Sequence, residues 1–407
     1  MKCAPWLTLS VPRIILLSAI GCVLTVLVVS AIAQSSTLNV TSPTAVVTNA
    51  RPTVGREQCS HRHAPMWQNE VMRWLPHFVS QPPVNWTVTQ TELQQFLEEM
   101  KPRRGGSSIA IHVAHNQIHL PPDIKHSGQL HIWLQGMIQL LSRSLAACPL
   151  APDHPDVRFI LSTSDWPIAH KATFQVPPPV LGTTTTRLHW DIPVPGSVLH
   201  TWKPAAVNVT WSERKDVAFF RGSPTCFNYS IPTHCPRFLA WKHGQLFPGE
   251  LDVGITRFMN ITAAAGQVVT PSVPIAEHAR FRYLLSFDGH SYARRFAEIM
   301  DLGSTVLKAD SILGYEEFYY PLLQEWVHYV PFVCQHESCN IADVVRSLRR
   351  QPARAEWIAN NLKAFAEDAL SAASVNMYWH VVLRNLIRMR QEHPWASAWD
   401  AIIERFG

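Results

Sequence analysis

The sequence predicts an α/β fold with two facing halves behind an apolar N-terminal segment. Strand patterns alternate with helical patterns twice, first between residues 108 and 161 and again between residues 216 and 307. Five prolines between Pro177 and Pro195 separate the two series and require a mostly extended connection. Apolar residues make up 47% of the 407 residues and charged residues 16%, a balance that supports sizeable cores and excludes a largely disordered chain.

The apolar N-terminal segment predicts a membrane anchor. Residues 14–33 form an uncharged run of 20 residues, which as a helix would be about 30 Å long and would match a hydrocarbon core. Lys2 and Arg13 precede the run, and the next charge is Arg51. The positive-inside rule therefore predicts a cytoplasmic tail and a luminal body. A cleaved signal peptide is the alternative, because Ala31-Ile32-Ala33 has the small-x-small form of a cleavage site.

Glycosylation sequons agree with a luminal body. Five Asn-x-Ser/Thr sequons follow the apolar run, at Asn39, Asn85, Asn208, Asn228 and Asn260. Both N-terminal hypotheses send the body into the secretory pathway. We therefore expect a single-pass type II protein of the endoplasmic reticulum or Golgi membrane, or a soluble luminal form if the signal is cleaved.

The cysteines suggest disulfides. Six remain outside the membrane region, namely Cys59, Cys148, Cys226, Cys235, Cys334 and Cys339. An even number in a luminal chain favours disulfides, although six cysteines allow about 15 connectivities. The short-loop pairs Cys226–Cys235 and Cys334–Cys339 are the favoured choice, which leaves Cys59 for Cys148. Zinc is the alternative, but the sequence has no Cys-x-x-Cys and no His-Glu-x-x-His motif.

The first half begins after a Ser/Thr/Val-rich stem. Ser108 to His119 alternates well enough for a strand or a hairpin, and Leu130 to Leu145 has apolar residues at helical spacing. Val157 to Leu161 is a short apolar run bounded by turn residues. Strand, helix and strand in this order give the β-α-β rhythm of an α/β domain.

The second half repeats the rhythm. Strands are expected at Asp216–Phe220, Arg282–Phe287 and Thr305–Leu307, with a helix from about Ser291 to Met300. The C-terminal part from about Ala355 to Arg390 is helical by pattern. The expected segments are a tail (1–13), an anchor (14–33), a stem (34–57), a first α/β domain (58–205), a second α/β domain (206–375) and C-terminal helices (376–407).

The charge distribution argues against a nucleic-acid partner. The net charge of +5 is spread along the chain and does not gather in one long basic block with interleaved aromatic residues.

Three segments contain the candidate chemistry. In the block 281–332 a strand ends in Asp288-Gly289 and a helix is expected to follow at once, with Arg294 and Arg295 in its first turns. Backbone N–H groups and a guanidinium at such a turn suit an anion, although a plain βα turn with surface arginines is the simpler interpretation.

The other two segments also follow strands. A strand runs into Arg221-Gly222-Ser223, where glycine permits close backbone approach. Asp165 follows the strand at Val157–Leu161 and would face a cleft as a candidate general base, or would form an Asx turn before Pro167.

Together these segments resemble glycosyltransferase family 90, which includes luminal protein O-glucosyltransferases and fungal capsule-associated xylosyltransferases. The resemblance covers roughly Phe159 to Trp379, and its most specific part is the block 281–332. The other matching residues are Leu161–Pro167, Pro179-Val180 through Asp191-Ile192, Phe219–Thr225 and Tyr378-Trp379.

The resemblance implies a GT-B enzyme with two Rossmann-like domains that uses a UDP-sugar, inverts the sugar carbon and needs no metal or cofactor. It implies Asp165 as the catalytic base and Arg221 and Arg295 as the charges that stabilise the departing diphosphate. Gly222, Ser223, Thr225, Asp288, His290, Ser291 and Tyr292 are further donor-binding candidates, and Glu298 is a weaker one. The sequence supports metal independence separately, because no two of its 13 aspartates stand two apart as in the metal-binding Asp-x-Asp motif.

The chain also departs from the family pattern. Pro224 and Asp288 stand where some glucosyltransferase members have arginine, and the C-terminus, Glu404 to Gly407, is not a Lys-Asp-Glu-Leu-like signal. The donor sugar (glucose or xylose) and the acceptor (protein or glycan) therefore stay open. The alternatives are a xylosyltransferase acting on polysaccharide and a glycan-binding pseudoenzyme. A hydrolase would need a carboxylate pair, and Asp165 has no evident partner.

Overall fold

The computed structural model describes residues 67, 108–121, 132–174, 178–226, 234–257, 269–336, 338–392, 399, 400 and 403. All of them belong to one compact unit, Val46–Gly407. The predicted tail, anchor and stem, Cys59, and the sequons at Asn39, Asn85, Asn228 and Asn260 lie outside the described residues. Within the described part of the chain, every helix is too short or too polar to cross a membrane.

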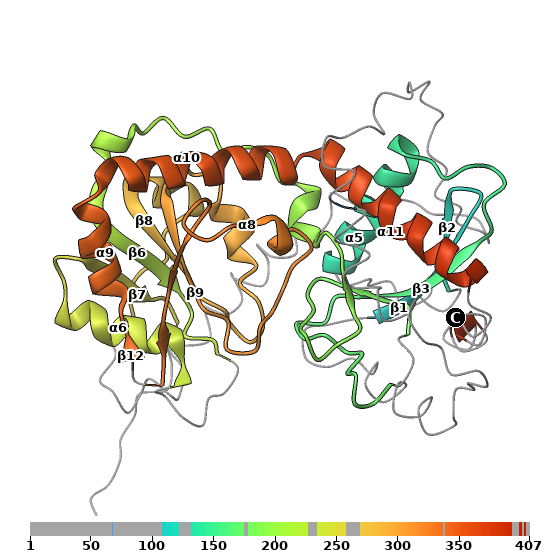
Figure 1. Ribbon diagram of the computed structural model, residues 1–407, viewed down its shortest axis with the longest axis horizontal. Helices are drawn as coiled ribbons and strands as arrows, with labels where there is room; N and C mark the ends of the chain where they lie inside the picture. Colours follow the sequence, from blue (N-terminus) through green and yellow to red (C-terminus); the bar gives the residue numbers. More distant parts are fainter. Residues whose placement is uncertain are drawn as a thin grey trace, which may run out of the picture. The chain divides into compact units, whose positions relative to one another are not determined.

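The first half is built on a mixed five-stranded sheet with the order β2-β1-β3-β4-β5 (Figure 1). Its strands are β1 (Ser108–Ala114), β2 (Gln117–His119), β3 (Val157–Ser162), β4 (Val180–Gly182) and β5 (Ile192–Pro193). The turn residues His115 and Asn116 both have positive φ, 50° and 62°, as a two-residue hairpin turn requires. The segment predicted as a strand or a hairpin is therefore a hairpin.

This hairpin changes the predicted β-α-β rhythm. Strand β1 pairs antiparallel with both β2 and β3, whereas β3, β4 and β5 are mutually parallel. The β1–β2 turn reverses the chain before helix α5 (Ile132–Ala147) begins. The helix therefore connects β2 to β3, and β1 lies between these two strands. The first half is a mixed sheet for this reason, and not a fully parallel one.

Two helices cover this sheet, α5 and α11 (Ala372–Glu392). The apolar positions of α5 are buried at helical spacing, including Leu134, Met137 and Leu141. Between the helices, the Ser144 hydroxyl donates to Asn376 Oδ1 at 2.9 Å. Figure 1 shows α11 beside α5, far along the chain from it.

The second half is a five-stranded sheet with the order β10-β9-β8-β6-β7, in which all neighbours are parallel. Its strands are β6 (Lys215–Gly222), β7 (Leu251–Ile255), β8 (Phe281–Ser286), β9 (Thr305–Ala309) and β10 (Val330–Phe332). The chain moves outward from β6 to β7 and then returns to the other side of β6 for β8, β9 and β10. The order reverses between β6 and β8, and parallel sheets bind ligands outside the carboxyl ends of the strands at such a point.

Helices pack on this parallel sheet, and one buried apolar cluster extends from it to the first half. The helices are α6 (Pro236–Leu246), α8 (Arg295–Ile299), α9 (Ile341–Arg349) and α10 (Pro352–Ala369). The 3-10 turns of this half are η4 (Trp211–Glu213), η6 (Ile275–Arg280) and η7 (Tyr320–Leu322), whereas η3 (Ser197–His200) packs on α5 in the first half. The cluster includes Phe159 of β3, Leu284 of β8 and Tyr378 of α11. The two halves therefore share a core.

The predicted C-terminal helical region is two helices. The chain leaves the helical path after α10, and the Ser371 hydroxyl accepts a hydrogen bond from the Ser374 backbone N–H at 3.1 Å. A serine in this position caps the start of a new helix. Helix α11 begins at Ala372, before the expected boundary at 375/376, and it packs on the first half. The expected boundary at 205/206 stays a prediction.

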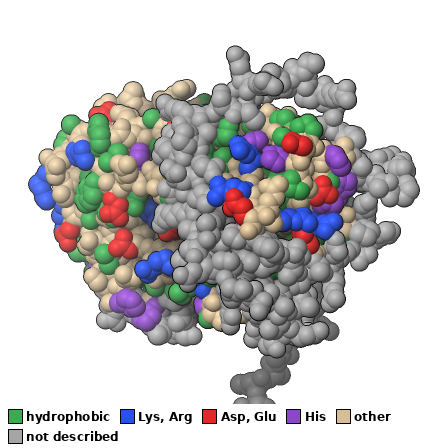
Figure 2. Space-filling view, turned by 45° about the vertical axis from the view of Figure 1, so that its right-hand side comes forward, with side chains coloured by type: hydrophobic (Ala, Val, Ile, Leu, Met, Phe, Trp, Pro, Cys, Tyr) green, Lys and Arg blue, Asp and Glu red, His purple; other side chains and the backbone are tan. Residues whose placement is uncertain are grey.

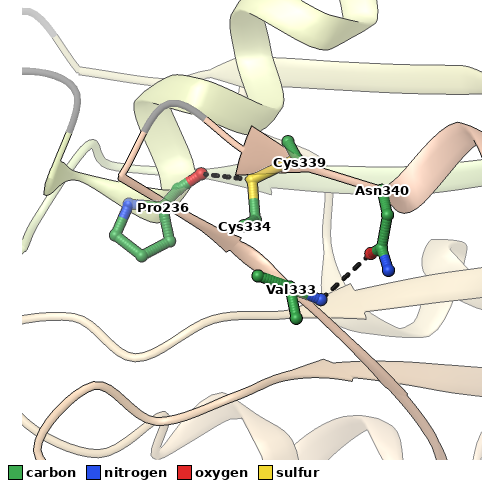
Figure 3. The surroundings of a disulfide bond; sticks show 5 residues. All are labelled: Pro236, Val333, Cys334, Cys339 and Asn340. Atoms are coloured by element: carbon green, nitrogen blue, oxygen red, sulfur yellow. Dashed lines mark hydrogen bonds between the residues drawn. A yellow bond between two sulfur atoms is a disulfide. The ribbon is translucent and has the colours of Figure 1, made fainter.

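The Cys334–Cys339 pair is a disulfide, as predicted. It closes the hairpin of β11 (Cys334–Gln335) and β12 (Ser338–Cys339), in which these two residues face each other. The Val333 N–H donates to Asn340 Oδ1 at 3.0 Å, and the Cys334 sulfur lies 3.6 Å from the Pro236 carbonyl oxygen. Figure 3 marks both contacts with dashed lines. The hairpin therefore contacts the start of α6.

The other predicted disulfides differ in outcome. Cys148 is disulfide-bonded, and its partner lies outside the described residues. The predicted Cys226–Cys235 bond is wrong, because both residues are buried thiols. The two thiols hydrogen-bond to each other, and the Cys235 thiol donates to the Pro224 carbonyl at 3.6 Å.

A loop after β9 joins the second half to the Thr183–Thr186 run. Glu316 and Thr185 exchange two backbone hydrogen bonds of 2.9 Å. The next residue, Glu317, is buried, and its Oε1 accepts a hydrogen bond from the Tyr319 hydroxyl at 2.8 Å. Burial raises the pKa of Glu317 from 4.5 to about 8. The folded protein therefore holds a proton here that the unfolded chain releases near pH 4.5.

Glu317→Gln should flatten the pH dependence of stability. Between about pH 5 and 8, folded Glu317 is protonated and unfolded Glu317 is not, so the wild-type free energy of unfolding should fall by about 1.4 kcal/mol per pH unit from this group alone. In urea denaturation at pH 5, 6.5 and 8, the free energy of unfolding of the variant should increase relative to that of the wild type as pH rises. The matched change at exposed Glu392, Glu392→Gln, should follow the wild type. Parallel profiles for Glu317→Gln and wild type would contradict the burial argument.

Candidate active site

A cavity of about 530 Å³ lies at the carboxyl ends of β6 and β8, where the strand order reverses. Both halves line it. The first half contributes residues that follow β3 and β4 together with residues of α5 and η3, namely Trp133, Met137, Thr163, Asp165, Thr183 and Ser197. The second half contributes residues that follow β6, β7 and β8. Parallel strands bring their ends to one edge of the sheet, so residues far apart in sequence meet here.

Asp165 lines this cavity from the turn that follows β3. Two local hydrogen bonds shape the turn, because the Ser162 hydroxyl accepts from the Ser164 N–H and the Ser164 hydroxyl accepts from the Trp166 N–H, each at 3.2 Å. Burial raises the pKa of Asp165, and the charges of His290 and Arg294 oppose that rise. A partly desolvated carboxylate facing a cavity can accept a proton from a bound hydroxyl.

The turn after β8 contributes His290, Ser291 and Tyr292 to the opposite wall. The His290 ring lies 5.9 Å from the Trp166 ring, centroid to centroid, so this turn meets the Asp165 turn. The Tyr292 hydroxyl hydrogen-bonds Thr183 of the first half, and burial raises its pKa. Contrary to the predicted helix start near Ser291, helix α8 begins at Arg295. Side chains, and not the end of a long helix, therefore provide the polar groups at this turn.

Arg295 and Arg221 have different environments. Arg295 lines the cavity, and its Nη1 donates to the Arg221 carbonyl oxygen. A Cβ at position 222 would lie 3.1 Å from Nη1 of Arg295 and 2.7 Å from Cζ of Phe220, so Gly222 permits this close packing. The Arg221 guanidinium turns away to Asp252, 2.6 Å distant. Strand residues alternate in direction, so Phe220 lines the cavity and Arg221 does not.

Arg237, which the sequence reasoning missed, ties the cavity loops together. From the first turn of α6 it donates to the carbonyl oxygens of Ser223 (3.1 Å), Phe287 (2.9 Å) and Asp288 (3.0 Å) and to the Thr225 hydroxyl (2.6 Å). One side chain thus joins the loop after β6 to the loop after β8. The sequence position of Arg237 could have identified it, because a cation in the first turn of a helix is disfavoured by the helix dipole and therefore needs other hydrogen-bond partners.

Asp288 faces away from this cavity. It lines a separate space of about 20 Å³ with Asp310 and Tyr315. Burial raises the pKa of Asp288, and the Lys308 charge and a hydrogen bond with Ser311 oppose the rise. Among the described residues, its buried Oδ2 atom has no hydrogen-bond partner. This carboxyl supports the turn after β8 and does not reach the ligand space.

The cavity has an excess of positive charge. Arg237, Arg257, Arg294 and Arg295 line it, against Asp165 and Glu298. The described residues hold no group of three or more His, Cys, Asp or Glu side chains with the arrangement of a metal site. On the face of the molecule in Figure 2, Lys and Arg side chains are scattered among Asp and Glu side chains and form no continuous basic surface. The site therefore suits an anionic ligand of limited size.

A model of glycosyl transferase family 90 matches residues 91–398. The chain belongs to this family. The match includes both sheets and every cavity residue discussed above, and it confirms the resemblance that the sequence motifs suggested.

One curated relative is protein O-glucosyltransferase 2 of Danio rerio, which is 24% identical over 318 residues, covering 73% of this chain and 59% of that protein. A second is the O-glucosyltransferase rumi homolog of Anopheles gambiae, 24% identical over 267 residues, covering 58% of this chain and 62% of that protein. A third is protein O-glucosyltransferase 1 of Homo sapiens, 23% identical over 254 residues, covering 56% of this chain and 62% of that protein. The chain spans about three fifths of the length of these relatives.

Most of the residues proposed from the family motifs meet in the cavity. Those that line it are Asp165, Ser223, Thr225, His290, Ser291, Tyr292 and Arg295, together with Glu298. Arg221, Gly222 and Asp288 do not line it: Arg221 binds Asp252, Gly222 makes room for Arg295, and Asp288 lies behind the turn.

The family resemblance implies a UDP-sugar as the ligand, so UDP serves as the probe of this prediction. Arg295→Ala and Arg221→Ala should differ in their effect on UDP affinity. Removing Arg295 should remove a charge-assisted contact of about 1.5–3 kcal/mol, or roughly 10- to 150-fold in affinity. Removing Arg221 should leave UDP affinity within about 3-fold and lower the melting temperature instead, because an ion pair with Asp252 is lost. Calorimetric titration with UDP and thermal melts of both variants separate the two effects. Equal loss of UDP affinity would place Arg221 at the diphosphate after all.

Proposed function

We propose that this chain is an inverting, metal-independent glycosyltransferase of the GT-B type that moves a sugar from a UDP-sugar to a hydroxyl of a protein or glycan in the secretory pathway. The main observation is one cavity in which the Asp165 carboxyl faces the arginines at the end of the parallel sheet. Family membership and the names of the relatives, which are O-glucosyltransferases, support the reaction class.

The division of the cavity suggests which substrate lies on which side. Arg295, Ser223 and Thr225 belong to the second half, at the point where a parallel sheet binds nucleotides. Asp165, Thr163 and Ser197 belong to the first half. The proposal therefore assigns the UDP-sugar to the second half and the acceptor hydroxyl to the first.

In the proposed reaction, the acceptor oxygen attacks the anomeric carbon from the face opposite the diphosphate. Asp165 accepts the hydroxyl proton as the new carbon–oxygen bond forms. The bond between the anomeric carbon and the diphosphate oxygen breaks, and UDP leaves with the electron pair. A single displacement of this kind inverts the configuration at the sugar carbon. Arg295 stabilises the negative charge that develops on the leaving oxygen, and Arg257, which also lines the cavity, is a second candidate for this role.

The arginines also provide a reason for metal independence. A leaving diphosphate needs a positive counter-charge, and several guanidinium groups line this cavity. The sequence lacks the Asp-x-Asp motif with which other sugar transferases bind a divalent ion. We therefore propose that arginines supply the charge that a metal supplies elsewhere, and that the UDP-sugar is the only co-substrate.

The donor sugar is proposed to be glucose, because the relatives are named O-glucosyltransferases. Xylose transfer to polysaccharide is the alternative, since the chain shares the family with xylosyltransferases by its motifs. A glycan-binding pseudoenzyme is the second alternative; the presence of Asp165, the proposed base, and of several arginines in the same cavity favours an enzyme.

A donor screen tests the reaction class. UDP release should be measured from UDP-glucose, UDP-xylose and other UDP-sugars, with and without EDTA, using a serine-containing peptide and a short oligosaccharide as acceptors. We expect one donor to dominate and EDTA to leave its rate unchanged. A strict Mn²⁺ requirement would overturn metal independence, and no UDP release from any donor would overturn the function.

Asp165→Asn should abolish transfer and leave UDP binding intact. The amide keeps the size of the side chain and removes its ability to accept a proton, so the rate should fall by roughly 10²–10⁴-fold. Calorimetry with UDP and a UDP-release assay on the same preparation check both parts. Substantial residual transfer would exclude Asp165 as the base.

A type II membrane topology with a luminal body completes the proposal. The sequons and the apolar run at 14–33 support it. Glycosidase treatment of membranes from expressing cells should increase the mobility of the full chain on gels, and alkaline carbonate should leave it in the membrane pellet. Release by carbonate would favour the cleaved-signal alternative, and insensitivity to glycosidase would argue against a luminal body.

A further inference from the structure

Arg294 and Arg295 are adjacent in sequence but lie against opposite walls of the cavity. The Arg295 guanidinium lies 5.5 Å from the Phe220 ring centroid, beside the end of β6. The Arg294 guanidinium lies 4.9 Å from the ring centroid of Trp133, which belongs to α5 in the first half. Consecutive side chains diverge in this way, so the two cations serve different parts of the cavity.

The Arg294 guanidinium has N–H groups that donate to no acceptor among the described residues. Arg237 uses its donors on four protein oxygens, and Arg295 donates to the Arg221 carbonyl. Within the described residues, the guanidinium of Arg294 makes no hydrogen bond or ion pair, and the residue is exposed. A guanidinium stacked on an aromatic face keeps its in-plane N–H groups available, because stacking uses only the faces of the two planes. These N–H groups can bind a ligand in the cavity.

Arg294 is also electrostatically coupled to Asp165. Its charge and that of His290 both oppose the rise that burial causes in the pKa of Asp165. The other titratable groups coupled to Asp165 are Tyr292 and Tyr315, whose pKa values are raised mainly by burial, that of Tyr315 to about 12. Both tyrosines are therefore neutral near neutral pH, and Arg294 is a permanent positive charge that acts on this carboxyl.

We propose that Arg294, held against Trp133, is a positioning residue on the acceptor side of the cavity: its guanidinium orients the acceptor hydroxyl toward Asp165 and takes no part in binding the diphosphate. This inference rests on the proposed function, since it presupposes that Asp165 is the base. It adds a specificity-determining residue that lies in the second half by sequence and acts on the substrate of the first half.

The test compares Arg294→Ala, Arg294→Lys and Trp133→Ala in the full chain. We expect UDP affinity by calorimetry to stay within about 2-fold of wild type in all three. Arg294→Ala should lower kcat/KM for the acceptor by about 10- to 100-fold, mainly through KM, because a charged hydrogen-bond donor to the acceptor is lost. Trp133→Ala should show the same acceptor defect, since the guanidinium loses the ring that holds it.

The pH profile separates positioning from a purely structural role. Without the Arg294 charge the pKa of Asp165 should rise, so the acidic limb of kcat/KM should move to higher pH in Arg294→Ala. Lysine keeps the charge and loses the planar fork, so Arg294→Lys should restore the acidic limb and leave the acceptor KM high. If no added acceptor raises the rate, the pH profile can be measured on UDP-sugar hydrolysis, in which water is the acceptor.

Arg354→Ala is the matched control. Arg354 also stacks on a tryptophan, with its guanidinium 4.2 Å from the Trp357 ring centroid, but this pair lies on α10 outside the cavity. Its removal should leave the acceptor KM and the acidic limb at wild-type values.

Three results would overturn the inference or its basis. Loss of UDP affinity in Arg294→Ala would assign Arg294 to the diphosphate. An unchanged acceptor KM and an unchanged acidic limb would leave it no positioning role. If the wild type released no UDP from any donor, the proposed function would fail, and the UDP titration would still decide whether Arg294 belongs to the nucleotide site.

Discussion

Four hydrogen bonds from the Arg237 guanidinium hold the loop after β6 to the loop after β8. These loops flank the point where the strand order of the parallel sheet reverses. The strands β6 and β8 are paired, but the connections that follow them leave in opposite directions at such a point, so the sheet itself does not fix the distance between the two loops. A cation in the first turn of a helix is electrostatically unfavourable, and charge-assisted bonds of about 1.5–3 kcal/mol each more than offset this cost. The shape of the cavity therefore depends on this side chain.

The cavity also depends on contacts between the two halves. Glu316 and Thr185 pair through their backbones, and Tyr292 hydrogen-bonds Thr183. The Ala205 N–H donates to Asp301 Oδ2 at 2.7 Å. Thr183 and Thr185 lie in the loop between β4 and β5 of the mixed sheet, and Ala205 lies in the connection that leaves this sheet. Asp165 and the arginines therefore lie in a cavity whose two walls are joined by hydrogen bonds at several positions.

The sequence allowed much of this arrangement to be predicted, and the failures have physical causes. Asp165 and the turn after β8 could be placed because each follows the carboxyl end of a strand in its own sheet, where ligands bind, so a strand pattern and a polar residue suffice. Arg221 was assigned to the ligand from its motif, although side chains alternate along a strand and its neighbour Phe220 occupies the cavity side. Arg237 depends on contacts with residues up to 51 positions away, which no local pattern reveals. The β1–β2 hairpin, with its positive-φ His115 and Asn116, reversed a strand direction that the pattern alone could not fix.

The first half is discontinuous in sequence. Its sheet and α5 come from residues 108–200, but α11 completes the helical layer beside α5. Tyr378 and Trp379 of α11 are fully buried, and the Tyr378 hydroxyl donates to the Pro193 carbonyl oxygen at 2.6 Å. A fragment that stops at residue 205 would expose the apolar face on which α11 packs. A fragment that begins at residue 206 would retain α11 with nothing to cover its buried side. Because the first half is built from two separate segments of the chain, a single cut between the halves does not yield two fragments that can be expressed and folded separately. Folding of the first half during synthesis must therefore wait until α11 has left the ribosome.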